Sequence, residues 1–180
     1  MKIFGIDPGS DRTGYGCIES DGSRHRLVIC GFLSGPAGAT FPEKLRAIHA
    51  GLRELLLFHR PDCVAVEDIF YARNVRSALR LGHARGVVLL AACEADLTIA
   101  EYAPAEIKRA VVGYGRAEKP QVQRMVKLLL KLDRLPTPHD AADALAVAIC
   151  HLNRGTGAIA DRLRAEPPRT TPRSWRDYRP

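Results

Sequence analysis

Four carboxylates stand out in the sequence because of the segments in which they lie. Asp7 and Glu67 each close a short apolar run that is typical of a buried strand. Asp140 and Asp143 are three residues apart in a predicted helix, so they share one of its faces. Taken singly, Asp7, Glu67 and Asp140 are equally well explained as a turn acid, a strand-end acid and a helix-capping acid.

Asp143 is the acid that a structural role explains least well. It lies within residues 141–149, a stretch that is apolar on nearly every side and therefore predicts a buried helix. A buried carboxylate is costly unless it is paired or bound to a metal. If two strand ends and a helix start meet at the carboxyl edge of one sheet, four acids repel one another and attract divalent cations. Oxygen ligands favour Mg²⁺ or Mn²⁺ over zinc, and two such ions ~3.5–4 Å apart can cleave a phosphodiester.

Hydrophobic periodicity predicts the elements that must position these acids. An Asp21-Gly22 turn between apolar runs predicts a hairpin within a three-strand antiparallel meander. A capping box from Thr40 to Glu43 opens the first helix. Strands are expected at 2–7, 13–19, 27–33, 64–66 and 97–102, and later helices at about 76–95, 104–112, 120–132 and 137–153. This order predicts one α/β domain over residues 1–153: a mixed five-stranded sheet, three antiparallel strands then two parallel, flanked by helices.

Composition and charge narrow the remaining possibilities. The 180 residues are 46% hydrophobic, and five cysteines without any CxxC spacing exclude a zinc finger and argue against a disulfide framework. The longest apolar run, residues 86–93, is far shorter than the ~20 residues of a membrane span, and no signal-peptide core is visible, so we expect a cytoplasmic protein. The net charge is +7, of which +4 lies in residues 154–180, a basic Arg- and Pro-rich tail that we expect to be flexible.

Five separate parts of the chain together resemble the RuvC family of bacterial Holliday junction resolvases. The matching blocks are 6–9 (IDPG) with 14–16 (GYG), 66–70 (VEDIF), 78–86 (ALRLGHARG), 111–119 (VVGYGRAEK) and 139–146 (HDAADALA). The resemblance covers about residues 1–153 and implies an RNase H-like fold. It also implies a homodimer that resolves four-way junctions in recombination and DNA repair, through symmetric metal-dependent nicks with 5′-phosphate and 3′-hydroxyl ends.

The same resemblance assigns roles to individual residues. It makes Asp7, Glu67, Asp140 and Asp143 the catalytic and metal-binding acids, with two Mg²⁺ ions in each active site and Mn²⁺ as a possible substitute. None of the four departs from the family pattern. It further implies that the RuvA and RuvB branch-migration proteins are partners.

Basic and aromatic residues near the acids gain a DNA-binding interpretation only through this resemblance. Lys108 and Lys119 are expected to contact DNA phosphates at the active site, although surface lysines are usually only solvated. Phe70 is expected to stack on an unpaired base, although a core position is the ordinary fate of such an aromatic residue. Some arginines of the region are expected to contact phosphates, with no means of telling which: Arg73, Arg76, Arg80 and Arg85.

Ala78, Gly82 and Gly86 repeat every four residues along a predicted helix. Their charged neighbours exclude a membrane helix. The small side chains either allow close packing on the protein's own sheet or, as the resemblance implies, form the homodimer interface.

Three other functions compete with a junction resolvase. The start of the chain, GIDPG at residues 5–9, is similar to the first phosphate loop of actin-like ATPases and sugar kinases, but those proteins need a second, duplicated half. An RNA-processing nuclease of the same fold would lack the blocks at 78–86 and 111–119. A binding module without activity would not need all four acids.

Overall fold

The computed structural model describes residues 1–68 and 74–164, with side chains described as far as residue 154. In chain order the elements are β1 (Lys2–Asp7), β2 (Arg12–Ser20), β3 (His25–Ser34), α1 (Phe41–His59), β4 (Cys63–Glu67), α2 (Val75–Glu94), β5 (Thr98–Tyr102), α3 (Pro104–Val112), α4 (Lys119–Leu129) and α5 (His139–Arg164). Among the described residues, no helix is both long enough and apolar enough to cross a membrane.

The strands form one mixed sheet in the order β3-β2-β1-β4-β5. β1, β2 and β3 pair antiparallel, whereas β4 lies parallel to both β1 and β5. The β2–β3 turn is short because Asp21 accepts hydrogen bonds from the backbone N–H groups of Ser23 and Arg24, and Gly22 adopts a φ of 99°. The predicted sheet of three antiparallel strands followed by two parallel ones is confirmed.

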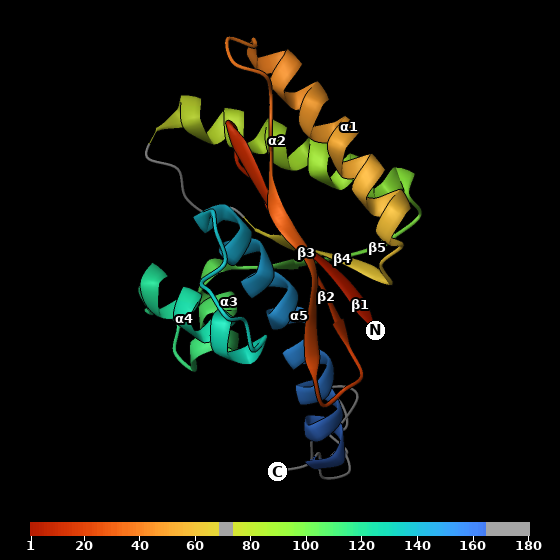
Figure 1. The fold of residues 1–180 in the computed structure, drawn as a ribbon, viewed down its shortest axis with the longest axis vertical. Helices are drawn as coiled ribbons and strands as arrows, with labels where there is room; N and C mark the ends of the chain where they lie inside the picture. The colour runs from red at the N-terminus through yellow and green to blue at the C-terminus, as the bar shows by residue number, and fades with distance from the viewer. Residues whose placement is uncertain (69–73, 165–180) are drawn as a thin grey trace, which may run out of the picture.

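Helices cover both faces of the sheet (Figure 1). α1 and α2 pack on one face, and α3, α4 and α5 pack on the other. Successive residues of a strand point to opposite faces, so Ile3 is buried under the α5 layer and Phe4 under the α1 layer. Burial on both faces explains why β1 and β4 are almost uniformly apolar in sequence.

Glycines in β1 and β2 let α5 lie directly on the sheet. A Cβ atom at Gly5 would collide with the backbone carbonyl oxygen of Ala144, and one at Gly14 would collide with that of Asp140. A strand glycine is typical of such a close backbone approach. Because Gly14 pairs with Asp7, the start of α5 is held beside the carboxyl end of β1.

Two helix ends differ from the sequence-based expectation. α5 continues to Arg164, past the expected end near Asn153. Gly155 and Gly157 weaken the helical signal, but the first proline, which is the stronger helix terminator, comes only at Pro167. α4 ends at Leu129 rather than at residue 132, since Lys131 takes a left-handed φ of 52°.

Candidate active site

Three of the four predicted acids line one cavity of about 140 Å³. Asp7 comes from the end of β1, Glu67 from the end of β4, and Asp143 from the second turn of α5. Lys108 of α3 and Lys119 of α4 line the same cavity. The convergence of acids and lysines that the sequence suggested is therefore present for these five residues.

The sheet and α5 explain why the acids meet. β1 and β4 are parallel neighbours, with Ile6 paired to Val66, so the residues that follow them reach the same edge. The side chains of Asp7 and Glu67 share a hydrogen bond. Asp143 joins them because the glycines of β1 and β2 bring α5 close to the sheet.

Burial and neighbouring negative charges raise the pKa values of Asp7 and Glu67. Burial, followed by the negative charges of Glu67 and Asp143, raises the pKa of Asp7 to about 8. Burial is also the main reason that the pKa of Glu67 is raised. A cation in this cavity would relieve both effects, because it favours the charged form of each carboxylate.

Lys119 supplies one positive charge to the cavity. Its Nζ atom lies 3.2 Å from Oδ2 of Asp143, whose side chain is only 17% exposed. The Asp143 carboxylate is the largest cause of the raised pKa of Lys119. The Lys119 side chain is mostly exposed, so it can also meet a phosphate that approaches from solvent.

Asp140 lies near the cavity but does not line it. It is in the first turn of α5, half-buried, with its backbone carbonyl against Gly14. The preceding residue, His139, is hydrogen-bonded through Nδ1 to the side-chain amide of buried Gln123 in α4, which anchors the start of α5. A metal-binding role for Asp140 stays a prediction.

The remaining predicted residues, apart from Phe70, are on α2. Phe70 lies outside the described residues. Arg76 is exposed in the first turn of α2. Ala78, Gly82 and Gly86 are also exposed, and a Cβ atom built at either glycine would have no atom within 4 Å. The alternative that this stripe packs closely on the protein's own sheet is therefore wrong.

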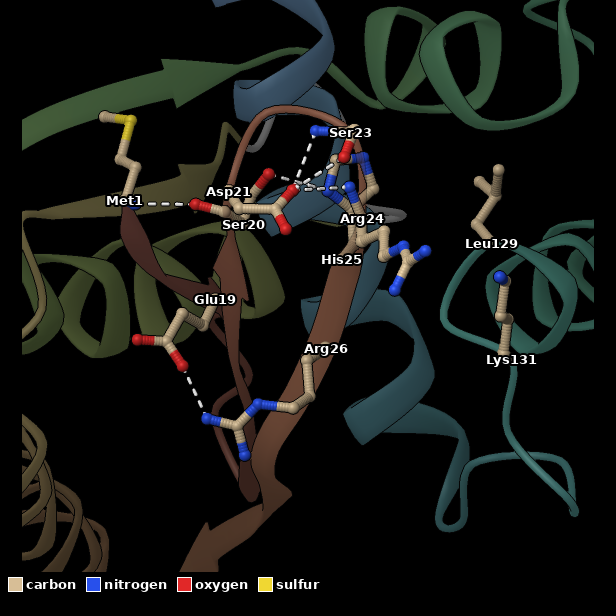
Figure 2. Close-up of a pocket in the computed structure, with 10 residues that line it drawn as sticks. All are labelled: Met1, Glu19, Ser20, Asp21, Ser23, Arg24, His25, Arg26, Leu129 and Lys131. Atoms are coloured by element: carbon tan, nitrogen blue, oxygen red, sulfur yellow. Dashed lines mark hydrogen bonds and ion pairs between the residues drawn. The ribbon is translucent and has the colours of Figure 1, made fainter.

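A larger cavity lies at the other end of β1 (Figure 2). It has a volume of about 850 Å³ and lies between the β2–β3 hairpin and the end of α4. Its two acids already have partners: Glu19 pairs with Arg26, and Asp21 caps the hairpin turn. We therefore place the chemistry in the smaller cavity, which holds the converging carboxylates.

The donor set of the smaller cavity fits a divalent cation. Among the residues that the structure describes, no three acid, histidine or cysteine side chains are arranged as a complete metal-ligand group. The three acids nevertheless offer only oxygen ligands, and their mutual repulsion is of the kind that a hard divalent ion relieves.

Sequence reasoning missed the apolar wall of the cavity. This wall is formed by Pro104, Ile107, Val122 and Ala146. Their helical periodicity marks them only as core residues, and no local signal separates a residue that lines a cavity from one that fills the core. The wall contributes to the burial that raises the pKa of Asp7.

The fold and the acids at its sheet edge define the class of protein. The chain matches a solved structure of Thermus thermophilus RuvC with a TM-score of 0.79 and 36% identity, over 88% of this chain and 97% of that one. The yeast mitochondrial Holliday junction resolvase Ydc2, at 14% identity and a TM-score of 0.66, shares the fold. The architecture is thus the RNase H-like fold of the resolvases, as predicted.

Sequence comparison gives the family. Residues 3–151 match the family described as crossover junction endodeoxyribonuclease RuvC, and the chain belongs to this family. A relative with that name in Syntrophomonas wolfei is 50% identical over 153 residues, or 85% of this chain and 89% of that protein. A relative with the same name in Trichlorobacter lovleyi is 48% identical, and the alignment covers the full length of both chains.

Proposed function

We propose that this protein is a structure-selective endonuclease that resolves four-way Holliday junctions by paired nicks in opposing strands. The observation that carries the proposal is the convergence of Asp7, Glu67 and Asp143 with two lysines in one cavity. Membership in the RuvC family supports it. So does a Thermus thermophilus RuvC, 34% identical over 87% of this chain, that was solved in complex with a Holliday junction substrate.

The acids of the cavity are the residues that would hold the metal. Asp7, Glu67 and Asp143 would bind Mg²⁺, or Mn²⁺ in its place, and Asp140 would contribute from the same face of α5. When bound, two such ions supply an activated water and stabilise the leaving oxygen, which leaves 5′-phosphate and 3′-hydroxyl ends.

The lysines act on the DNA rather than on the metal. Lys108 and Lys119 place positive charge at the wall of the cavity, where the negative charge of the transition state would develop. A cation held by Asp143 would weaken the contact between this carboxylate and Lys119. The Lys119 ammonium group would then be available to the phosphate. Arg76 and Phe70 would bind the DNA beyond the reacting phosphate.

Two nicks require two active sites, and the exposed face of α2 would bring them together. Ala78, Gly82 and Gly86 form a small-residue stripe that nothing in the described chain covers. Val75 and Leu79 on the same helix are 76% and 60% exposed. An apolar stripe of this kind favours a helix-to-helix homodimer contact.

Several finer expectations belong to the same proposal. The catalytic domain comprises residues 1–153, and residues 154–180 are a basic extension that strengthens DNA binding through its +4 charge. RuvA and RuvB act with the protein in the cytoplasm.

Among the competing functions, an ATPase is the least supported, because the described chain contains a single copy of the sheet.

A cleavage assay tests the proposal. The protein is incubated with Mg²⁺ or Mn²⁺ and either a mobile four-way junction or a linear duplex of the same sequence. We expect paired, ligatable nicks in the junction alone. Equal cutting of the duplex, trimming of RNA, or ATP turnover without junction cleavage would contradict it.

A further inference from the structure

We infer that Arg85 is a positioning residue for Glu67, because it ties α2 to the ends of β4 and β5. The inference rests on the proposed function for the meaning of a cleavage rate, but its contacts are independent of that function. The sequence grouped Arg85 with possible phosphate contacts. The structure gives its guanidinium group two carboxylate partners inside the protein instead.

The two carboxylates lie on either side of the Glu67 position. Arg85 Nη2 is 3.3 Å from Oδ1 of Asp68, the residue that directly follows Glu67. The same nitrogen forms an ion pair with Glu101 of β5, and Glu101 pairs with Val66 in the sheet. The guanidinium group therefore contacts the residue that directly follows Glu67 and the β5 residue that pairs with Val66, directly before it.

The backbone holds the same turn from the β5 side. The N–H group of Asp68 donates a hydrogen bond of 2.8 Å to the carbonyl oxygen of Tyr102, which pairs with Glu67. β5 thus fixes the backbone at this point, and Arg85 fixes the Asp68 side chain. Together they limit how far the Glu67 carboxylate can move from Asp7 and Asp143.

The burial of Arg85 argues against a role in direct phosphate binding. Its side chain is 28% exposed, and its Nε atom is buried without a hydrogen-bond partner among the described residues. An unpartnered buried donor lowers stability, so optimal stability alone does not explain this arrangement. A guanidinium group that is turned toward two strand-end carboxylates fits a positioning role better.

Arg85 also connects Glu67 to the exposed stripe of α2. Gly82 and Gly86 lie three residues before it and one residue after it on the helix. Any displacement of α2 at the proposed dimer contact is therefore transmitted to the end of β4 through this ion pair. The position of Glu67 depends on α2 as well as on the sheet.

Three variants separate positioning from the alternatives. Arg85→Met keeps an unbranched apolar side chain at this position but removes both ion pairs. Arg85→Lys keeps the positive charge but lacks the planar guanidinium group, whose terminal nitrogen Nη2 reaches both carboxylates. Arg53→Met is the matched control, because Arg53 of α1 also forms an ion pair with α2, 3.2 Å from Glu94 near its far end.

Three quantities are measured for each variant. They are junction affinity in EDTA as a function of salt, the single-turnover cleavage rate and its Mg²⁺ requirement, and the rise in melting temperature on adding Mn²⁺. Arg85→Met should lower the cleavage rate and raise the Mg²⁺ requirement by about 10–100-fold, as expected when a partner of a metal ligand is lost. Its Mn²⁺-dependent rise in melting temperature should be smaller, and its junction affinity and salt slope should match Arg53→Met. Arg85→Lys should be intermediate.

Several results would overturn the inference. Cleavage by Arg85→Met at the same rate as by Arg53→Met would do so. So would a lower melting temperature of Arg85→Met if the protein cleaves normally at temperatures below its melting point. Weaker binding with a salt slope reduced by about 0.9 would make Arg85 a phosphate contact. If Arg85→Met does not fold, Asp68→Asn, which keeps the pair with Glu101, decides the matter, and normal cleavage by it contradicts the inference.

The outcome stays separable from the proposed function. If the wild-type protein cuts no junction, the proposed function fails. The inference is then judged on the Mn²⁺-dependent rise in melting temperature, and equal rises in wild type and Arg85→Met would overturn it.

Discussion

Asp7 is the acid of the site whose ionisation is most strongly disfavoured. Its pKa is raised to about 8, first by burial and then by its two acidic neighbours. The sequence pointed instead to Asp143 as the costly acid, because it lies on the most apolar helix. The structure places Asp143 beside Lys119, which comes from a different helix 24 residues earlier. Local sequence patterns cannot show which of several converging acids will meet a distant lysine.

Asp7→Asn should change how stability depends on pH in the absence of metal. The folded protein holds the Asp7 proton more tightly than the unfolded chain does, since the pKa rises from 3.8 to about 8. Wild-type stability in EDTA should therefore fall as pH rises through this window. The asparagine variant lacks that proton, so it should match wild type near pH 4 and be the more stable protein near pH 8.

Urea unfolding across this pH range, in EDTA, measures the effect. Adding Mg²⁺ should reverse the order at pH 8, because the metal stabilises only a folded protein that binds it. Parallel pH profiles for the two proteins would contradict the assignment of Asp7 to a crowded, metal-free carboxylate group.

Among the elements, α5 does most to bring the site together. Its existence and its start near the acids were predictable from periodicity and from the Asp140 and Asp143 spacing. Its close approach to the sheet was not, because that depends on the absence of side chains at Gly5 and Gly14 on other elements. The sequence contains these glycines, but only the assembled fold shows what each of them faces.

Gly14→Ala should disturb this packing. The added methyl group meets the backbone of Asp140, which cannot move without displacing α5. We expect a loss of about 1–3 kcal/mol in the free energy of unfolding, together with slower metal-dependent cleavage. Gly31→Ala is the control, because its methyl group would meet the movable end of the Tyr15 side chain. Equal stability of the two variants would argue against close packing at Gly14.

Gly82→Leu tests the element that faces outward. The position is open in the single chain, so the larger side chain should leave the fold intact but obstruct a close helix-to-helix contact. Sedimentation should show a shift from dimer to monomer at low micromolar concentration. Arg124→Leu adds an exposed leucine to α4 and should remain dimeric. A Gly82→Leu protein that stays dimeric would place the subunit contact elsewhere.

At the scale of the whole molecule, the topology was largely predictable from the sequence. A short Asp21-Gly22 turn requires antiparallel neighbours, and helices between the later strands require parallel ones. The side chains that connect distant elements were not predictable. Arg85, for example, has the same sequence signature whether it meets a phosphate or two carboxylates. Long-range polar contacts are the information that the fold adds.

The central claim is that the carboxylates of this cavity, and not merely its positive charge, cut the junction. Glu67→Gln removes one carboxylate charge with little change in shape, while binding depends mainly on Lys and Arg contacts to phosphates. The most direct measurement is the cleavage rate of a saturated four-way junction in Mg²⁺, with Glu54→Gln on the exposed side of α1 as the control. We predict that Glu67→Gln binds the junction like wild type but cuts at least about 100-fold more slowly, whereas Glu54→Gln cuts normally. A Glu67→Gln protein that cuts at the wild-type rate would contradict the account.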